Sequence, residues 1–425
     1  MKIVCTPPDF VAGDLPSADL NVVLYSRPTR AGTGSVGTSV IEEIRRKKLH
    51  PAERAWDLLS ISLSVIAADI CCLRKKSPDG WTREINLSVA VIDTDFWNSE
   101  KDLLEKQLRF LTTDLWRIHF LKGGILPVRG QEEVIPDEDC VVLLSGGLDS
   151  LVGTLNLVAE GKKPYAVSQV SKGDKERQSS FASTIGGGLS HLQLNHNTNC
   201  PGQNDLSQRA RSLIFLAYGV VAATALKTYQ EGEEVMLYVC ENGFISINPP
   251  LTGARLGSLS TRTTHPVFLD LFRRLLNSAG LRIRLVNPYQ FKTKGELLAE
   301  CENQDYLKKN AYMTTSCGRF GRNAYHHCGR CVPCMVRRAA FERWGVSDST
   351  EYVYDDLSLD DKQHARFDDV RSAAMAVLQA DAEGIDTWIG PDLSSAMLGD
   401  LSPYRSVVLR GFGELKGFLE KAGVL

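Results

Sequence analysis

A strand-like run followed by a glycine loop is the first feature with chemical meaning. Cys140 to Leu144 is short, apolar and rich in Val and Leu, as expected for a buried strand of a parallel sheet. The loop SGGLDS follows at residues 145–150, and apolar residues then recur at helical spacing, which predicts a helix from Leu148 to Ala159. A strand, a glycine loop and a helix start together present backbone N–H groups to an anion, most often phosphate. An ordinary strand-to-helix turn is the alternative.

Four cysteines that could bind a metal ion lie within a short stretch near residue 325. Two overlapping C-x2-C spacings let their thiolates converge on one ion, and Gly329 eases the turn between them. Four sulfurs make a closed, structural zinc site, whereas an iron–sulfur cluster, a redox pair or scattered buried thiols are the alternatives. The neighbouring His326 and His327 could replace one ligand, although adjacent imidazoles in a polar loop are more often solvated. The predicted ligands are Cys317, Cys328, Cys331 and Cys334.

Alternating strand-like and helix-like segments after residue 140 place these groups in a doubly wound parallel sheet, where ligands bind at the carboxyl ends of the strands. Strands are expected at Tyr165–Val170, His191–Leu194, Val235–Cys240 and Ile283–Val286, and helices at Leu213–Lys227 and Val267–Ala279. We therefore predict an α/β nucleotide-binding domain with a zinc-binding segment over residues 137–345.

The flanking regions are predicted to be additions to this domain. Residues 1–136 show helical patterns at Pro51–Leu73 and Phe96–Thr113 around a strand at Glu84–Ile92, which predicts an accessory α/β domain. Residues 346–425 are acidic and helical, with a capping-box pattern at Ser358 and a last helix over Val407–Leu419.

Composition excludes some classes of protein. The 425 residues include 49 Lys and Arg against 51 Asp and Glu, so no global basic charge favours nucleic acid as a direct substrate. No apolar run reaches the length of a membrane span, and we expect a cytoplasmic protein. In that compartment the 11 cysteines are not expected to form a disulfide framework.

The loop and the cysteine cluster together resemble a known family. Ser145, Gly146, Gly147, Leu148, Asp149 and Ser150 match the SGGxDS loop of the PP-loop ATP pyrophosphatases. The cluster, ending in Arg337, is similar to that of the 7-cyano-7-deazaguanine synthases (QueC), as are the stretches Arg211–Leu216, with Ser212 in place of asparagine, and Thr293–Glu296. The resemblance covers roughly Asp139 to Arg343.

Two departures separate this chain from that family. Ser171–Gln178 differs from the Gly-Gln-Arg-His segment of the synthases, and their tyrosine-proline-aspartate-cysteine-arginine stretch is missing. The stretch Glu241–Pro266 stands in its stead, and with the flanking domains it resembles the QatC type of QueC-like protein found in bacterial anti-phage operons.

The resemblance implies ATP-dependent, AMP-forming activation of the carboxylate of 7-carboxy-7-deazaguanine and its transfer to an amine. The amine is ammonia in the synthases, and the N-terminus of a partner protein from the same operon in the defence-associated relatives. The implied cofactors are ATP, Mg²⁺ and Zn²⁺. An RNA thiolation enzyme and a non-catalytic, ATP-sensing defence subunit are the alternatives.

Site residues are expected as follows. The loop residues are expected to bind the pyrophosphate of ATP. Asp149, exposed on the loop, is expected to hold the loop in shape or to approach a magnesium ion. Lys294 is the first choice for the cation at the α-phosphate and Arg211 the second, although either could be a solvated surface charge. Substrate-binding residues are expected at strand ends and in the long stretch after residue 240. Glu241 and Asn242 are expected to bind the guanine-like edge of the substrate, and Arg262 or His265 is expected to bind its carboxylate.

Overall fold

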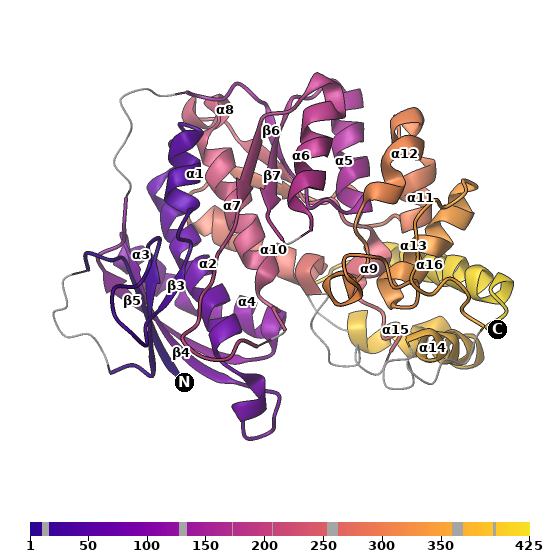
Figure 1. Cartoon of the computed structure of the whole chain (residues 1–425), viewed down its shortest axis with the longest axis horizontal. Helices are drawn as coiled ribbons and strands as arrows, with labels where there is room; N and C mark the ends of the chain where they lie inside the picture. Colours follow the sequence, from indigo (N-terminus) through magenta and orange to yellow (C-terminus); the bar gives the residue numbers. More distant parts are fainter. Residues whose placement is uncertain are drawn as a thin grey trace.

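The computed structural model describes residues 1–10, 17–126, 134–171, 173–205, 207–252, 262–358, 369–393 and 397–425. It contains two five-stranded sheets, both entirely parallel, followed by a group of C-terminal helices (Figure 1). The predicted α/β class is therefore confirmed. In the view of Figure 1, the N-terminal unit lies at the left and the helices near the C-terminus lie at the right.

The N-terminal unit, residues 1–126, is built on a sheet with the order β3-β2-β1-β4-β5. Its strands are β1 (Lys2–Thr6), β2 (Leu20–Leu24), β3 (Gly34–Val36), β4 (Glu84–Val91) and β5 (Leu115–Lys122). Its helices are α1 (Val40–Arg46), α2 (Glu53–Cys71), α3 (Thr94–Ser99) and α4 (Lys101–Thr112). Of these strands the sequence predicts only β4. The helical pattern predicted over Phe96–Thr113 is confirmed, but it is divided between two helices at Glu100.

The second sheet has the order β10-β9-β6-β7-β8, that of a doubly wound fold. Its strands are β6 (Cys140–Leu143), β7 (Pro164–Gln169), β8 (His191–Leu194), β9 (Val235–Tyr238) and β10 (Ile283–Val286), each within two residues of its prediction. Strand β7, the next strand in the chain, pairs with one edge of β6, and β9 pairs with the other edge. The carboxyl end of β6 is therefore the topological switch point, and the glycine loop begins there.

Helices cover both faces of this sheet. Those that contact its strands include α5 (Leu148–Ala159), α6 (Lys175–Thr184), α7 (Arg211–Ala225) and α10 (Pro266–Ser278). The other helices of this region are α8 (Lys227–Gln230), α9 (Gly243–Ile247), α11 (Lys294–Ala299), α12 (Gln304–Asn310) and α13 (Val332–Trp344). The side chain of a residue at Gly153 of α5 would meet the Sγ of Cys240 at 2.2 Å, so glycine here allows the helix to pack closely on the end of β9.

The two sheets share one hydrophobic core. Helix α2 packs on the N-terminal sheet and α7 packs on the second sheet, and the two helices pack against each other between them (Figure 1). Almost every residue of α2 is buried, and its serines at 60, 62 and 64 donate to backbone carbonyls one turn earlier. The core cluster that includes Ile3 and Leu87 of one sheet also includes Val141 and Leu237 of the other.

The C-terminal helices are α14 (Asp369–Glu383), α15 (Ile385–Leu393) and α16 (Ser402–Lys421), the last extending the helix predicted over Val407–Leu419. Helix α16 packs on α13 and α9 through a second cluster that includes Phe244, Val407 and Phe412. The capping-box pattern predicted at Ser358 lies in a stretch that is mostly outside the described residues.

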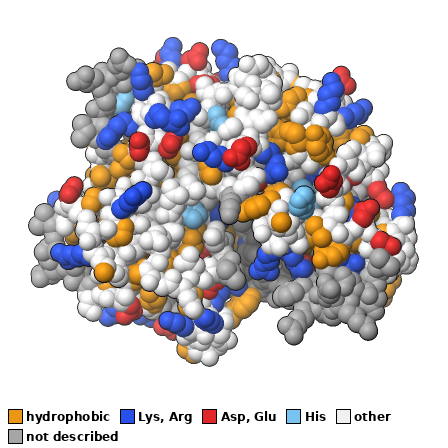
Figure 2. Space-filling view, viewed as in Figure 1, with side chains coloured by type: hydrophobic (Ala, Val, Ile, Leu, Met, Phe, Trp, Pro, Cys, Tyr) orange, Lys and Arg blue, Asp and Glu red, His pale blue; other side chains and the backbone are white. Residues whose placement is uncertain are grey.

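Surface features agree with the composition. On the face shown in Figure 2, basic and acidic side chains are scattered among each other. Among the described residues, no helix is long and apolar enough to span a bilayer.

Candidate functional site

The glycine loop forms a tight turn directly before α5. Gly146 has a φ of +86°, which a residue with a side chain adopts only under strain. The backbone N–H of Gly147 donates to Ser145 Oγ at 3.2 Å, and Ser150 Oγ donates to the carbonyl of Gly147 at 3.0 Å. Gly147 stands at the N-cap of α5 without a side chain to cap it, so the first N–H groups of the helix remain for a ligand.

A second set of side chains, which the sequence analysis missed, holds this loop from outside. Gln178 donates from Nε2 to the carbonyl of Ser145 at 3.0 Å, and the N–H of Thr315 donates to the carbonyl of Gly146 at 3.0 Å. Asp174 accepts from Thr315 Oγ1 at 2.9 Å and forms an ion pair with Arg177 at 2.9 Å. Three of these residues belong to the stretch 171–178, where the sequence departs from the synthases, and that departure was the only signal for them.

Asp149 is not exposed, contrary to the expectation from its place in the loop. It is 4% exposed, forms an ion pair with Lys294, and accepts from the Nδ2 and the backbone N–H of Asn242 at 2.7 and 3.1 Å. Burial alone would raise the pKa of Asp149, but the Lys294 ammonium and hydrogen bonds from Glu241 and Asn242 hold it below its usual value. Asp149 is the second residue of α5, and its contacts with Asn242 and Lys294 direct its side chain away from solvent.

Lys294 owes its place to a helix start. Thr293 caps α11 by accepting from the N–H of Glu296, and Glu296 accepts from the N–H of Thr293, which completes a capping box. Lys294 is therefore the first residue of the helix and is 7% exposed. The C-terminal α16 reinforces this corner, because Glu414 accepts from the hydroxyl of Thr293 and from the N–H of Gly295.

Glu241 differs from Asp149 in the direction of its pKa shift. Burial raises the pKa of Glu241 well above its usual value, and the negative charge of Asp149 raises it further. Its side-chain Oε1 accepts from Asn242 Nδ2 at 3.3 Å. Asn242 is fully buried and caps α9 by accepting from the N–H of Ile245 at 3.0 Å. A protonated Glu241 carries both a donor and an acceptor.

A cavity of about 550 Å³ opens beside the glycine loop. Arg211 donates from Nε to Gln169 Oε1 at 3.4 Å and from Nη2 to Ser171 Oγ at the cavity edge. Lys294 and Asp149 are not among the residues that line it. The lining includes Ser145, Gly147, Ser150, Arg211, Glu241 and Cys317.

Two unpartnered hydroxyls also line this cavity. Ser212 Oγ and Thr264 Oγ1 are buried, and neither has a hydrogen-bond partner among the described residues. Buried polar atoms in proteins are normally satisfied, so the two hydroxyls are available to a polar ligand. Ser212 was noticed in the sequence only as a replacement for asparagine, and nothing in the sequence singled out Thr264.

The two residues expected to meet the substrate carboxylate have other partners. His265 caps α10 by accepting from the N–H of Val267 at 3.2 Å, and burial lowers its pKa to about 3, so the ring is neutral. Arg262 donates to the carbonyl of Phe110 at 3.3 Å and lies over the ring of that residue. Neither lines the cavity beside the loop.

The four predicted cysteines converge. Their sulfur atoms all lie within 4.8 Å of one another, and two of the pairs are 3.9 Å apart. A tetrahedral zinc ion with Zn–S bonds of about 2.3 Å requires sulfurs roughly 3.8 Å apart, so the cluster fits that ion. Gly329 has a φ of +83°, and a side chain there would meet the carbonyl of Tyr354 at 2.2 Å. Cys317, Cys328, Cys331 and Cys334 would hold the metal, which stabilises the loops around it.

The histidines beside the cluster are not ligands in this arrangement. His326 is exposed, whereas His327 is buried and accepts from the N–H of Ser316 at 3.1 Å, so the expectation that both are solvated is wrong. Burial lowers the pKa of His327 to about 4. The fully buried Arg337 donates to Thr314 and Thr350. It therefore ties α13 to the segment that supports the glycine loop.

A doubly wound parallel sheet with a glycine loop at its switch point defines an α/β nucleotide-binding protein. Comparisons with known proteins narrow this class. A model of the family described as queuosine biosynthesis protein QueC matches residues 263–345. The chain is 28% identical over 241 residues to the 7-cyano-7-deazaguanine synthase of Rhizobium etli, which covers 50% of this chain and 91% of the relative.

Another relative gives the same result. The 7-cyano-7-deazaguanine synthase of Acetivibrio thermocellus is 27% identical over 241 residues, which cover 50% of this chain and 97% of that protein. Over half its length the chain is thus similar to nearly complete 7-cyano-7-deazaguanine synthases, and it is QueC-like at that level. The other half of the chain lies outside these alignments.

Proposed function

We propose that this protein activates the carboxylate of 7-carboxy-7-deazaguanine with ATP and transfers the acyl group to an amine. A carboxylate oxygen attacks the α-phosphorus of ATP, pyrophosphate leaves, and a mixed anhydride with AMP forms. The amine nitrogen then attacks the carbonyl carbon, AMP leaves, and the nitrogen gives up its proton to solvent. The glycine loop facing a cavity that also contains Arg211 and Glu241 is the observation that carries this proposal.

The described residues divide the work between them. The N–H groups and hydroxyls of residues 145–150 bind the departing pyrophosphate, with Mg²⁺ as its counter-ion. Arg211 lines the cavity, so it takes precedence over Lys294 as the cation near the phosphates. Lys294, paired with Asp149, sets the charge of the buried corner behind Glu241. Glu241, Ser212 and Thr264 supply hydrogen bonds to the heterocycle.

We further propose that the acceptor is the N-terminal amine of a partner protein in a bacterial anti-phage system. The flanking regions support this, because half of the chain lies outside the alignments to the synthases. A chain terminus must be held near the anhydride long enough to react, and added surfaces can provide that positioning. Self-association is the competing explanation for those regions.

Pyrophosphate release tests the activation step. Release that depends on 7-carboxy-7-deazaguanine supports it, whereas an RNA thiolation enzyme or an ATP-sensing subunit would show no such dependence. Intact masses of proteins encoded beside this one, after incubation with enzyme, ATP and substrate, test the acceptor. An acyl adduct on a partner's N-terminus supports the ligase, and free nitrile as the sole product would instead indicate a synthase that uses ammonia.

A further inference from the structure

The segment that joins β8 to α7 crosses the N-terminal unit before it enters the site. We call residues 196–210 the strap, all of which are described except residue 206. Its first part pairs with the edge strand β3: the N–H of Ser35 donates to Asn199 at 2.9 Å, and the N–H of Asn199 donates back at 2.8 Å. The strap therefore adds an antiparallel partner to an otherwise open sheet edge.

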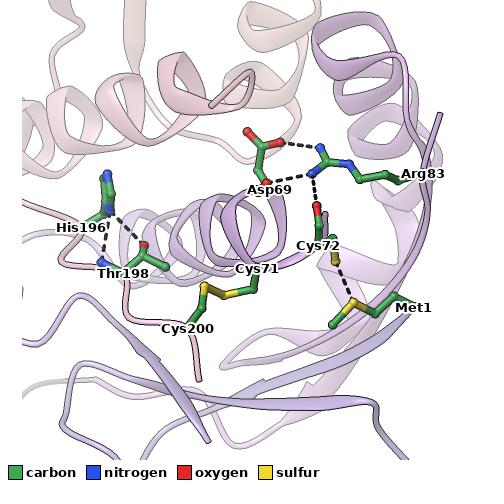
Figure 3. The surroundings of a disulfide bond; sticks show 8 residues. All are labelled: Met1, Asp69, Cys71, Cys72, Arg83, His196, Thr198 and Cys200. Atoms are coloured by element: carbon green, nitrogen blue, oxygen red, sulfur yellow. Dashed lines mark hydrogen bonds and ion pairs between the residues drawn. A yellow bond between two sulfur atoms is a disulfide. The ribbon is translucent and has the colours of Figure 1, made fainter. Parts of the chain in front are cut away.

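A disulfide joins the strap to α2. Cys200 of the strap is bonded to Cys71, the last residue of α2 (Figure 3). The sequence analysis expected no disulfide framework among the 11 cysteines, and this bond was not foreseen. It connects two residues 129 positions apart in the sequence and fixes the strap to the helix that fills the shared core.

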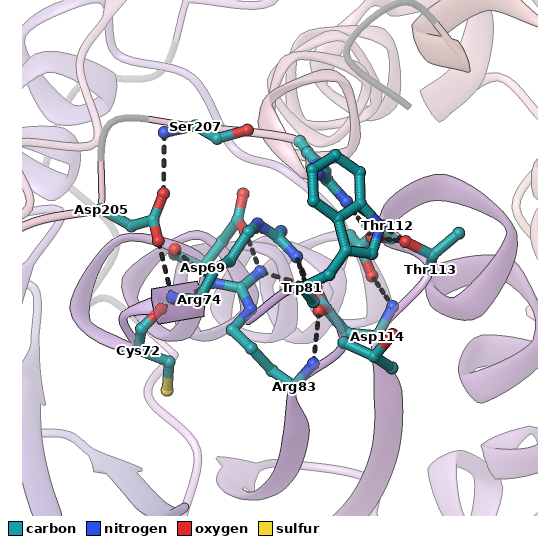
Figure 4. Close-up of polar contacts among 12 residues, drawn as sticks. Asp69, Cys72, Arg74, Trp81, Arg83, Thr112, Thr113, Asp114, Asp205 and Ser207 are labelled. Carbon is teal, nitrogen blue, oxygen red and sulfur yellow. Dashed lines mark hydrogen bonds and ion pairs between the residues drawn. The ribbon is translucent and has the colours of Figure 1, made fainter. Parts of the chain in front are cut away.

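The middle of the strap is held by hydrogen bonds to the end of α2 and to the residues that follow it. The N–H of Asp205 donates to the carbonyl of Ile70 at 2.8 Å, and Asp205 Oδ2 accepts from the N–H of Arg74 at 2.8 Å (Figure 4). Lys75 donates to the side chain of Gln203 at 2.9 Å. The strap thus follows the C-terminal end of α2 closely.

The last residues of the strap meet a buried ionic network. Arg74 and Arg83 each pair with both Asp69 and Asp114, and all four side chains are less than a tenth exposed (Figure 4). Asp69 uses its Oδ2 to accept from the N–H of Ala210 at 2.9 Å, at the N-cap of α7.

Arg209, the neighbour of Ala210, is clamped in the same region. It is 4% exposed, and its guanidinium lies 4.2 Å from the ring centroid of Trp81. It also donates to the carbonyl of Thr112 at 3.1 Å and to the hydroxyl of Thr113 at 3.2 Å. The N-terminal unit thereby fixes both the backbone and the side chain that precede Arg211.

We infer that the N-terminal unit is a positioning element for the nucleotide cavity and acts through the strap. Gln208, Arg211 and Ser212 line that cavity, and they lie on either side of the two clamped residues 209 and 210. If the strap were flexible, each ligand that ordered it would lose affinity through the strap's loss of conformational entropy. Because the strap is already fixed in the folded chain, that entropy is lost on folding and ligand binding does not carry the cost. The inference rests on the proposed function only for the identity of the ligand, ATP.

ATP binding measured by calorimetry in the full-length chain tests this inference. Arg209→Ala and Cys200→Ser each release one attachment of the strap, and we expect the dissociation constant for ATP to rise on the order of tenfold in Arg209→Ala and less in Cys200→Ser. In turnover, the KM for ATP should rise with little change in kcat, because the clamp orders a binding residue without touching the reacting atoms. Wild-type protein treated with dithiothreitol should behave like Cys200→Ser, and dithiothreitol should not change that variant further.

Arg282→Ala is the control for the loss of an arginine that packs on an aromatic ring. The Arg282 guanidinium lies 4.4 Å from the ring centroid of Tyr229 and donates to that residue's carbonyl at 2.8 Å, but Arg282 is exposed and directly precedes β10. The affinity of the Arg282→Ala variant for ATP should stay within about twofold of that of the wild type. Hydrogen exchange should show faster exchange at the start of α7 in the strap variants alone.

Unchanged ATP affinity in both strap variants, or an equal loss in Arg282→Ala, would overturn the inference. Cys200→Ser gives the answer if Arg209→Ala does not fold. A wild-type chain that binds ATP but never releases pyrophosphate would contradict the proposed function and leave the positioning inference intact.

Discussion

The charge balance of the site depends on a few buried side chains. Asp149 and Lys294 form an ion pair with less than a tenth of either side chain exposed, and Asn242 adds two hydrogen bonds to the carboxylate. Such a pair adds little net stability, because removing both charges from water offsets their attraction. Loss of one partner is nonetheless strongly destabilising, since the other charge then stays buried without a counter-charge. Asp149 is therefore expected to contribute to the folded state as well as to the proposed chemistry.

Asp149→Ala should abolish pyrophosphate release and also lower the free energy of unfolding by about 3–5 kcal/mol, because the Lys294 ammonium would stay buried without a counter-charge. Urea denaturation and a pyrophosphate assay measure the two effects. The double variant Asp149→Asn/Lys294→Met removes both charges, so it should recover much of the stability but none of the turnover. A single variant as stable as wild type would show that the pair is not buried in solution.

A second prediction concerns pH and His265. The pKa of His265 in the folded chain is about 3, below its usual 6.5, so the unfolded chain takes up a proton first as pH falls. The free energy of unfolding therefore decreases from pH 6.5 toward pH 3, by at most about 1.4 kcal/mol per pH unit from this group. His265→Asn keeps a good helix cap without a titrating ring, and its denaturation curves should shift less with acid than those of wild type. The exposed His326→Asn is the control, and equal acid sensitivity of wild type and His265→Asn would contradict the assignment.

Sequence patterns identified these side chains to different degrees. The loop residues and the cysteines could be located because a motif marks them. Asn242, predicted to bind the substrate because it follows a strand end, is instead fully buried, does not line the cavity and caps α9. The burial of Asp149 could not, because it depends on Lys294, which is 145 positions away in the chain. His265 looked like a substrate ligand because a helix-capping role is visible only once the start of α10 is known.

Among the elements, the cysteine segment is the most self-contained. Its four sulfurs come from one stretch, and backbone N–H groups donate to them, such as that of Cys328 to Cys317 Sγ at 3.3 Å. Cys317 also lines the cavity beside the glycine loop, so the fold of this segment shapes one cavity wall. Loss of the metal is therefore expected to affect both local order and activity.

Purified protein should contain about one zinc ion per chain, because four thiolates give an apparent binding free energy on the order of 10 kcal/mol or more. Elemental analysis of wild type and Cys331→Ser measures this. Cys301→Ser, a buried thiol outside the cluster, is the control and should keep its zinc. Iron with inorganic sulfide, or unchanged zinc in Cys331→Ser, would refute the assignment.

The strands of the second sheet and the helices α5, α7 and α10 were predicted because each carries its own periodicity, whereas α6, α11, α12 and α13 were not predicted. The strands of the N-terminal sheet were mostly missed. β3 has only three residues, and β2 is a five-residue strand whose pairing with β1 is set by the tertiary structure. The break between α3 and α4 was hidden because apolar residues continue at helical spacing on both sides of Glu100.

For the protein as a whole, the shared core means that the second sheet depends on the N-terminal unit for its stability. Helix α2 is buried between the two sheets, and its removal would expose the apolar face of α7. A chain of residues 137–425 should therefore lack a cooperative unfolding transition, as measured by circular dichroism during urea denaturation. A soluble truncated chain that unfolds cooperatively would show that the second sheet folds alone.

Isotope transfer distinguishes adenylation of the deazaguanine carboxylate by ATP from other routes of activation. The substrate is prepared with ¹⁸O in both carboxylate oxygens and incubated with enzyme, ATP and an amine, and the AMP is then weighed by mass spectrometry. Attack of the carboxylate on the α-phosphorus predicts that each AMP gains one ¹⁸O, because the C–O bond breaks when the amine attacks. AMP without label, or ADP and phosphate as the products, would contradict the proposed function.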